Sequence, residues 1–308
     1  MDDRDVFRTE VKRYKKIVIW GFRTHFHTHR YIHAAFYDNL KKLGASVVWV
    51  EDAARNKTVV SAGDLVIAMN MAAQHVPYVT GAYYCLHNFD ENEWTRQFLA
   101  QIDRTHSVRL QVYKNSAEQS DQKWDEVTYF DSYSRTLYQP WGTNLLAEEF
   151  KPPIAPRGRL VFWVGSVWNN ALNQGNIQEI DELKTALALH GLRFVQLRFI
   201  GDALNTFFIR RSRLAPAIGG AWQVQQNYLP CRMFKNISYG QLGFSNIQKF
   251  DSLLHNAHIP GDSISDLVDN ALALSAPEYV RLVLDQQSVV RRHTYLQKCI
   301  NIFKAFVA

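Results

Sequence analysis

The sequence predicts an α/β protein built from two halves, each a mostly parallel sheet covered by helices. Three observations support this prediction. In the first half, apolar runs of strand length alternate with amphipathic segments of helical period. A proline-rich stretch then interrupts the chain near its middle, and the strand–helix alternation begins again after it. Such repetition is typical of parallel sheets with helices on both faces.

The first half begins with a charged segment, after which residues 16–20 predict a buried parallel strand. A helix is expected from Arg30 to Leu43, because apolar residues recur there at helical spacing and Gly44 follows as a stop. Further strands are expected at residues 46–50, 64–68 and 78–86, with shorter ones at 109–113 and 126–130.

The second half starts with an apolar strand at residues 160–166, which ends in Gly-Ser. A helix over residues 176–190 follows, with Gly191 as its stop, and then a strand at 193–199. Pro230 is expected to open another helix that ends at Gly240, before a short strand at 242–247. The residues from Pro277 onward predict one or two further helices.

The proline-rich stretch at residues 151–158 is the predicted linker, because closely spaced prolines are incompatible with regular structure. It divides the chain into an N-terminal domain, 1–150, and a C-terminal domain, 151–308. The last helix of the C-terminal domain is expected to be able to cross back to the first domain.

Composition narrows the class of function. The 308 residues are 47% hydrophobic and 21% charged, as in ordinary folded proteins, and the net charge of +6 suits an anionic ligand or surface. The basic residues are scattered, so we expect no nucleic-acid partner. The three cysteines lack the spacing of a disulfide framework or a zinc site. With no signal-like start and no apolar run of membrane length, the chain is expected to be cytoplasmic and able to contact a membrane peripherally.

The turn after the first strand is the first candidate site, since ligands of such sheets gather at the carboxyl ends of the strands. It carries Arg23, His25, His27 and His29. Imidazole titrates near neutral pH and can take a proton from a hydroxyl group. We therefore predict His27 as a general base, with His25 as second choice, and Arg23 and His29 as contacts to the acceptor.

Two other interpretations of this turn stay open. His29 and His33 have the i, i+4 spacing of helical metal ligands, although no cysteine or carboxylate lies nearby in the sequence. The histidines can also be ordinary exposed or packing residues. Asp90, after a later strand, is a candidate to orient the base, but Glu91 and Glu93 follow it, as at a common helix start.

The second candidate site combines a strand end with a helix start. Gly165 and Ser166 end the first strand of the second half, where a small residue lets backbone amides approach a phosphate. Arg232, Lys235 and Asn236 lie in the first turns of the helix after Pro230, and two cations at a helix N-terminus favour a diphosphate. Three residues are expected near the ribose or the adjacent loop: Ser238, Tyr239 and Gly240. The alternative is a basic, solvated helix face.

Pro230, Arg232 and Phe234, followed by Gly240, resemble the donor-site helix of CgeB-like and family 4-like glycosyltransferases of the GT-B fold. The resemblance implies two Rossmann-like domains facing each other across a cleft, with an arginine on the donor diphosphate. The chain departs from the family at Lys235-Asn236, where an acidic residue usually follows to hold the ribose. The His-bearing first turn instead resembles inverting GT-B enzymes, whose base is a histidine at that place.

The predicted function is transfer of a hexose or pentose from a nucleotide-diphosphate sugar to a hydroxyl acceptor on a glycan, as in polysaccharide biosynthesis. The N-terminal domain is expected to bind the acceptor and the C-terminal domain the donor. No cofactor and no metal are expected, since GT-B enzymes as a group need none and no DxD pair ends a strand. The alternatives are a sugar-nucleotide epimerase of the same fold and a non-catalytic nucleotide- or polyanion-binding protein.

Overall fold

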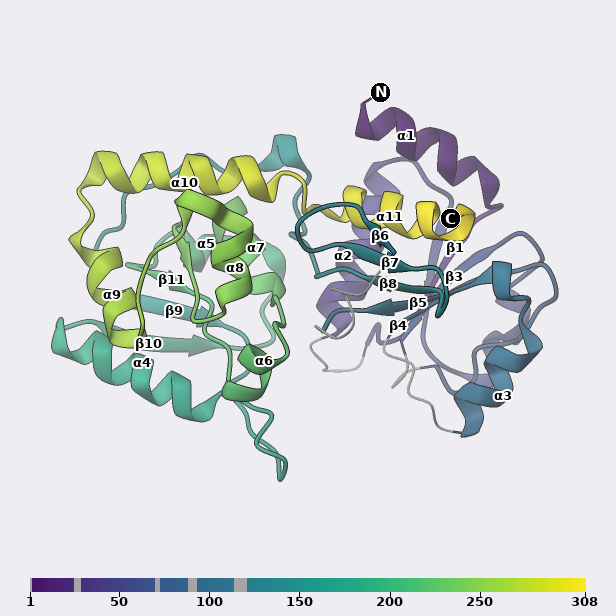
Figure 1. The fold of residues 1–308 in the computed structure, drawn as a ribbon, viewed down its shortest axis with the longest axis horizontal. Coiled ribbons are helices and arrows are strands. Elements are labelled where there is room, and N and C mark those ends of the chain that lie inside the picture. Colours follow the sequence, from purple (N-terminus) through teal and green to yellow (C-terminus); the bar gives the residue numbers. More distant parts are fainter. Residues whose placement is uncertain (1, 25–28, 70–72, 88–92, 114–120) are drawn as a thin grey trace. The chain divides into compact units, whose positions relative to one another are not determined.

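The computed structural model describes residues 2–24, 29–69, 73–87, 93–113 and 121–308. The chain forms two compact units (Figure 1). Unit 1 contains Met1–Gln139 together with Tyr295–Ala308, and unit 2 contains Pro140–Thr294. Within the described ranges, no helix has both the length and the apolar character needed to cross a membrane.

Unit 1 is organised around an eight-stranded sheet of order β2-β1-β3-β4-β5-β8-β7-β6. The first six of these strands run parallel, and β7 and β6 complete the sheet as antiparallel neighbours. Its strands are β1 Ile17–Trp20, β2 Val47–Val50, β3 Leu65–Met69, β4 Tyr83–His87, β5 Ser107–Gln111, β6 Gln122–Lys123, β7 Tyr129–Asp131 and β8 Thr136–Tyr138.

Helices cover both faces of this sheet, which explains why β1 and β3 are buried along their whole length. One face packs Val18, Val66 and Tyr84 against Phe98 of α3. Elsewhere in the unit, Phe36 of α2 meets Tyr295 of α11 with ring centroids 4.6 Å apart. The helices of unit 1 are α1 Asp3–Glu10, α2 His29–Lys42, α3 Glu93–Gln101 and α11 Tyr295–Val307.

Unit 2 has two short parallel pairs, β9 Leu160–Val164 with β10 Arg193–Leu197, and β11 Ala215–Pro216 with β12 Gly243–Phe244. The chain enters β11 beside β9, because the Arg213 amide donates to the Leu160 carbonyl (2.7 Å). Its helices are α4 Ile177–Leu189, α5 Asp202–Ile209, α6 Ala221–Gln225, α7 Cys231–Ser238, α8 Gln248–Leu254, α9 Ile264–Ala273 and α10 Ala276–Val290.

Both units also contain short 3₁₀ helices, at Val11–Arg13, Ala54–Val59, Arg104–His106, Ala147–Glu149 and His255–Ala257.

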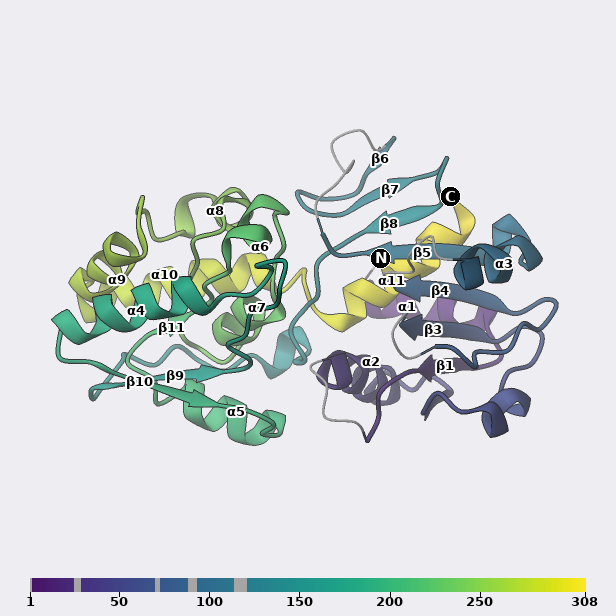
Figure 2. The same cartoon turned by 90° about the horizontal axis from the view of Figure 1, so that it is seen from below.

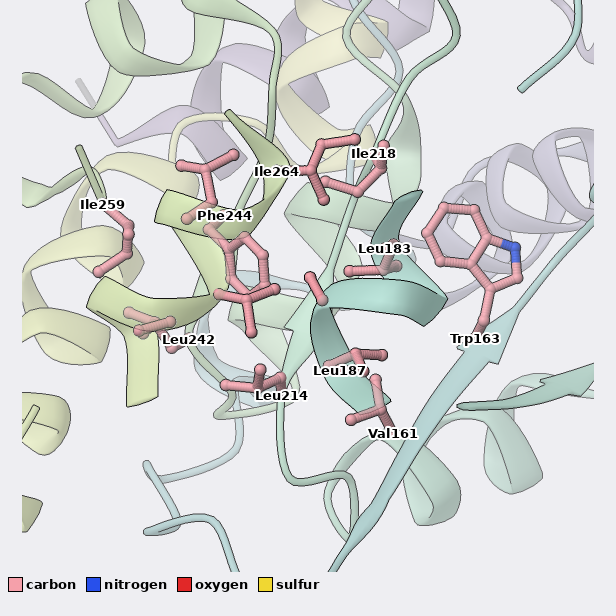
Figure 3. Packing of buried hydrophobic residues seen from close by; sticks show 14 of the residues in the cluster. Val161, Trp163, Leu183, Leu187, Leu214, Ile218, Leu242, Phe244, Ile259 and Ile264 are labelled. Carbon is pink, nitrogen blue, oxygen red and sulfur yellow. The ribbon is translucent and has the colours of Figure 1, made fainter. Parts of the chain in front are cut away.

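The core of unit 2 follows from the two-residue period of β9. Val161 and Trp163 point to one face, where they pack with Leu183 and Leu187 of α4 (Figure 3). Phe162 points to the other face and contacts Phe208 of α5, with ring centroids 5.1 Å apart. Figure 2 shows the result, with α4 and α5 on opposite sides of the β9–β10 pair.

The structure confirms an α/β protein with a large, mostly parallel sheet and refines several predicted bounds. The strand expected over 78–86 is too long, because β4 begins only at Tyr83. The residues before it form a turn in which the Tyr84 hydroxyl donates to the Pro77 carbonyl and accepts from the Val79 amide, both at 2.8 Å. Helix α5 was not predicted, since its outward face carries apolar residues that blur the polar half of a helical pattern.

The proline-rich stretch at residues 151–158 lies within unit 2. The Lys151 amide donates to the Ser238 carbonyl (2.8 Å), and the Ile154 amide donates to the Gly240 carbonyl (3.1 Å). Arg210 and Arg213 donate to the carbonyls of Pro152 (3.0 Å) and Pro156 (2.9 Å). Two arginines of the basic cluster at 210–213 therefore bind this stretch.

Candidate functional site

The carboxyl edge of the sheet in unit 1 gathers polar side chains at the ends of β1 and β2. Glu51 follows β2 and accepts hydrogen bonds from the amide of Arg23 (2.7 Å) and from the hydroxyl of Thr24 (2.7 Å). The Arg23 guanidinium reaches back to the Trp49 carbonyl (3.0 Å). Glu51 therefore fixes the start of the turn in which the sequence predicts the base. His25 and His27 lie outside the described residues, as does Asp90.

Three histidines of unit 1 lie close together. His29 and His33 belong to the first turns of α2, and His87 is the last residue of β4. The rings of His29 and His87 are 5.5 Å apart. Burial holds the pKa of His87 well below its ordinary value, and the neighbouring His29 and His33 lower it further. His87 is therefore a neutral imidazole at physiological pH.

Sequence analysis missed His87, although its place at the end of an apolar parallel strand was a signal. Among the residues that the structure describes, no group of three histidine, cysteine, aspartate or glutamate side chains could hold a metal ion. The spacing of His29 and His33 thus has no third ligand within those ranges.

Asp52, the other carboxylate at this edge, is engaged by donors from two neighbouring segments. The Trp20 indole and the His75 amide donate to one of its oxygens, both at 2.8 Å. The Gln74 amide donates to the other oxygen at 3.1 Å. These bonds tie Gln74 and His75 to the end of β1, and protein donors occupy both oxygens of Asp52.

In unit 2 the predicted strand end and helix start do meet. Arg232 of α7 stacks on the indole of Trp163, with its guanidinium carbon 3.6 Å from the ring centroid. Its Nε donates to the Val164 carbonyl (3.2 Å). A Cβ on Gly165 would lie 2.2 Å from Nη2 of Arg232, so the arginine reaches this strand end because residue 165 has no side chain.

The charge of Arg232 is retained and is not neutralised by a neighbouring acid. Burial lowers its pKa to about 10, which keeps the guanidinium protonated at neutral pH. Within the ranges that the structure describes, no carboxylate lies at ion-pair distance from Arg232. A half-buried cation that has no carboxylate partner in the described ranges and lies at the carboxyl edge of a parallel strand is a suitable contact for an anionic ligand.

Lys235, one turn further along α7, faces the interior of unit 2. Its ammonium group donates to Asp202 at the start of α5 (3.1 Å). Burial acts to lower the pKa of Lys235, but the nearby Tyr239 and Asp202 raise it by more, so the pKa lies above its ordinary value. Lys235 is thus committed to an internal ion pair that connects α7 to α5.

This pair leads to a prediction on stability. Lys235→Gln is expected to lower the free energy of unfolding by about 1–3 kcal/mol at pH 7, because Asp202 loses its partner but is itself a third exposed. Since the folded pKa of Lys235 is raised, the contribution is fully present below the ordinary pKa of 10.5 and is lost only as pH rises through the folded value. Urea unfolding of both proteins at neutral and strongly alkaline pH measures it.

The control is Lys184→Gln, which removes an exposed ion pair of 2.8 Å with Asp181. It is expected to change stability by less than about 1 kcal/mol. Equal effects of the two substitutions would contradict the structural role of Lys235. Nucleotide affinity of Lys235→Gln, measured alongside, tests the predicted donor contact separately.

The remaining residues of the predicted donor site hold α7 in place. The side-chain amide of Asn236 donates to the Ala215 carbonyl (2.9 Å), and the Ser238 hydroxyl contacts that of Thr143 (2.7 Å). The Tyr239 hydroxyl donates to Asn144 (2.7 Å). All three side chains are buried, and Gly240 lies against the Pro152 carbonyl. The contact of Asn236 to the diphosphate stays a prediction, as do the contacts of the other three residues to the ribose or the adjacent loop.

The loop from β9 to α4 is a rigid, projecting feature next to Ser166. The Trp168 amide donates to the Asn176 side chain (3.2 Å), and the Asn176 amide donates to the Trp168 carbonyl (2.8 Å). Asn169 and Asn170 bind further amides of the loop with their side chains. Trp168 itself is 40% exposed. Sequence analysis did not single out this tryptophan.

The sequence was compared with protein-family models and with curated proteins. No protein-family model matches the chain, and a search of curated proteins finds no similar sequence.

Proposed function

We propose that the chain is a GT-B glycosyltransferase that transfers a sugar from a nucleotide-diphosphate donor to a hydroxyl acceptor. One observation carries the proposal, namely the stacked guanidinium of Arg232 beside Gly165 with no carboxylate partner in the described residues. A planar guanidinium can bind phosphate oxygens with two parallel hydrogen bonds. Its stacking on Trp163 fixes the plane of that group before the ligand arrives.

In this proposal Arg232 neutralises the charge that builds on the leaving diphosphate as the glycosidic bond breaks. The missing side chain of Gly165 leaves the room in which the guanidinium reaches the end of β9. The base that deprotonates the acceptor hydroxyl is the predicted His27 or His25 of the first turn. Arg23 and His29 are the predicted acceptor contacts. The cytoplasmic location and the absence of a metal remain parts of this proposal.

The epimerase alternative is less well supported. It requires carboxylates that are able to exchange protons with the sugar. The two carboxylates described at the sheet edge of unit 1, Glu51 and Asp52, accept hydrogen bonds from the backbone and side chains around them. The non-catalytic alternative predicts nucleotide binding without release of nucleoside diphosphate, so turnover decides between it and the transferase.

The test is a panel of nucleotide sugars and free nucleoside diphosphates, with binding followed by calorimetry and turnover by nucleotide release. Arg232→Ala is expected to weaken binding of the preferred nucleotide about 10- to 100-fold, the loss of a charge-assisted hydrogen bond worth about 1.5–3 kcal/mol. Arg232→Lys is expected to recover only part of the affinity, because an ammonium group lacks the fork geometry.

Arg211→Ala is the matched control. The Arg211 guanidinium also stacks on an aromatic ring at 3.6 Å, that of Phe207, but it lies on the exposed surface after α5. This substitution is expected to leave nucleotide affinity unchanged. Absence of binding by every nucleotide at millimolar concentration would contradict the proposal, and so would equal affinity of Arg232→Ala and the unsubstituted protein.

A further inference from the structure

The outer face of α5 in unit 2 combines exposed apolar side chains with a cation. Leu204, Phe207 and Arg211 are spaced i, i+3 and i+7, which places them on one side of the helix and its C-terminal turn. Leu204 is 52% exposed and Phe207 is 45% exposed. Within unit 2, all of whose residues the structure describes, Figure 2 shows no element beyond α5 on this side.

The orientation of α5 is fixed by its inner side. Phe208 packs on Phe162 of β9, with ring centroids 5.1 Å apart, and Ile209 is fully buried beside Tyr239. Lys235 binds Asp202 at the first turn. A helix anchored at three points cannot rotate to bury Leu204 and Phe207, so the protein holds these two side chains in water.

An arginine stacks on each of two exposed phenylalanines, one on α5 and one in the chain just before it. The guanidinium carbon of Arg211 is 3.6 Å from the ring centroid of Phe207, and that of Arg198 is 4.9 Å from the ring of Phe199. Phe199 is itself 48% exposed. From Arg193 to Arg213 the chain carries five arginines and a single carboxylate, Asp202, which is paired with Lys235. The surface is therefore cationic as well as apolar.

We propose that this face, formed by Arg198, Phe199, Leu204, Phe207 and Arg211, docks on an anionic lipid bilayer. Phe and Leu side chains on an interfacial helix enter the boundary between headgroups and acyl chains. Arginines next to them bind lipid phosphates while their aliphatic parts stay with the apolar layer. The net charge of +6 adds long-range attraction to an anionic surface.

Two other partners fit the observations less well. A two-fold contact between copies of the chain would bring Arg198 and Arg211 against a second set of the same arginines, and like charges oppose that contact. A nucleic acid would use the arginines, but the exposed Leu204 and Phe207 offer nothing to a phosphate backbone. A dimer in solution is an outcome that the experiment below distinguishes from binding to a bilayer.

The experiment is flotation of the full-length protein with vesicles of phosphatidylcholine alone or mixed with phosphatidylglycerol, without nucleotide. We expect co-flotation with the mixed vesicles, weakened by high salt. Phe207→Glu is expected to reduce the partition coefficient at least tenfold, and Arg198→Glu combined with Arg211→Glu is expected to do the same. Leu189→Glu at the end of α4 is the control, because Leu189 is 77% exposed and lies outside the face.

Thermal unfolding checks that each variant is folded. If Phe207→Glu is not folded, Leu204→Glu replaces it as the test of the apolar part of the face. The proposal is overturned by equal flotation of the glutamate variants and the unsubstituted protein. It is also overturned by binding that does not depend on phosphatidylglycerol, or by a dimer in solution that these substitutions dissociate. Nucleotide binding depends on Arg232 and is measured without vesicles. Failure of the membrane proposal therefore leaves the transferase proposal intact, and failure of the transferase proposal leaves the membrane proposal intact.

Discussion

Gly165→Ala is expected to reduce nucleotide affinity about 10- to 100-fold, as Arg232→Ala does, because it displaces the same cation. The added methyl group would lie 2.2 Å from Nη2 of Arg232, so the guanidinium must leave the Trp163 ring and the Val164 carbonyl. The substitution therefore displaces the cation from the end of β9.

The same substitution is expected to lower stability by roughly 2–4 kcal/mol. Residue 165 has a φ of +144°, a backbone conformation that essentially only glycine adopts. Contact with Arg232 adds an overpacking cost of about 1–3 kcal/mol, reduced to the extent that the flexible arginine moves away. Calorimetric titration with the preferred nucleotide gives the affinity, and urea unfolding gives the stability.

Gly191→Ala separates the effect of a side chain at a positive φ from the effect of contact with Arg232. Gly191 has a φ of +65°, but an added Cβ would meet nothing within 4 Å. We expect it to cost about 1 kcal/mol of stability, as replacement of glycine at a left-handed position does, with no change in nucleotide affinity. A folded Gly165→Ala protein with unchanged affinity would show that Arg232 does not contact the nucleotide from its stacked position.

The sequence could predict that Gly165 and Arg232 lie close together, because local sequence signals place each of the two residues. An apolar strand that ends in Gly-Ser puts residue 165 at the carboxyl edge of a parallel sheet. Pro230 opens α7, which puts Arg232 in its first turn. The stacking of Arg232 on Trp163 could not be predicted, since no local sequence signal indicates which aromatic ring of the core lies under the arginine.

Lys235 shows where local reasoning stops. From the sequence it is a cation at a helix start, as suitable for a phosphate as Arg232. Its partner Asp202 is 33 residues away, and the contact exists only because α5 and α7 pack together. Buried charges are paired, but the sequence does not say with which residue. His87 is the converse case, a residue placed by its strand whose histidine neighbours come from α2.

The loop that presents Trp168 depends on a contact between two glycines. A Cβ on Gly220 would lie 1.7 Å from the Gly175 carbonyl oxygen, and a Cβ on Gly175 would lie 1.8 Å from the Trp168 carbonyl oxygen. Backbone atoms cannot rotate away as a side chain can. The start of α6 and the end of this loop are therefore in contact only while residues 175 and 220 carry no side chain.

Gly220→Ala is consequently expected to lower the free energy of unfolding by about 3 kcal/mol or more, and the melting temperature by about 10 °C. The φ of −72° at Gly220 is open to any residue, so backbone strain contributes nothing and the whole effect comes from the contact. Because α6 must move, the bond from the Ala221 amide to Glu179 of α4 (2.6 Å) is lost as well. Calorimetric melting of the full-length protein measures the change.

Gly201→Ala is the matched control, since Gly201 precedes α5 as Gly220 precedes α6. The two residues have nearly the same backbone angles, with φ of −70° and −72° and ψ of 166° and 163°. An added Cβ on Gly201 meets nothing within 4 Å. It is expected to cost about 0.5 kcal/mol, the usual difference between glycine and alanine before a helix. Equal stability of the two variants would mean that α6 can separate from Gly175 at little cost, and the loop that carries Trp168 would then lack the rigid support assigned to it.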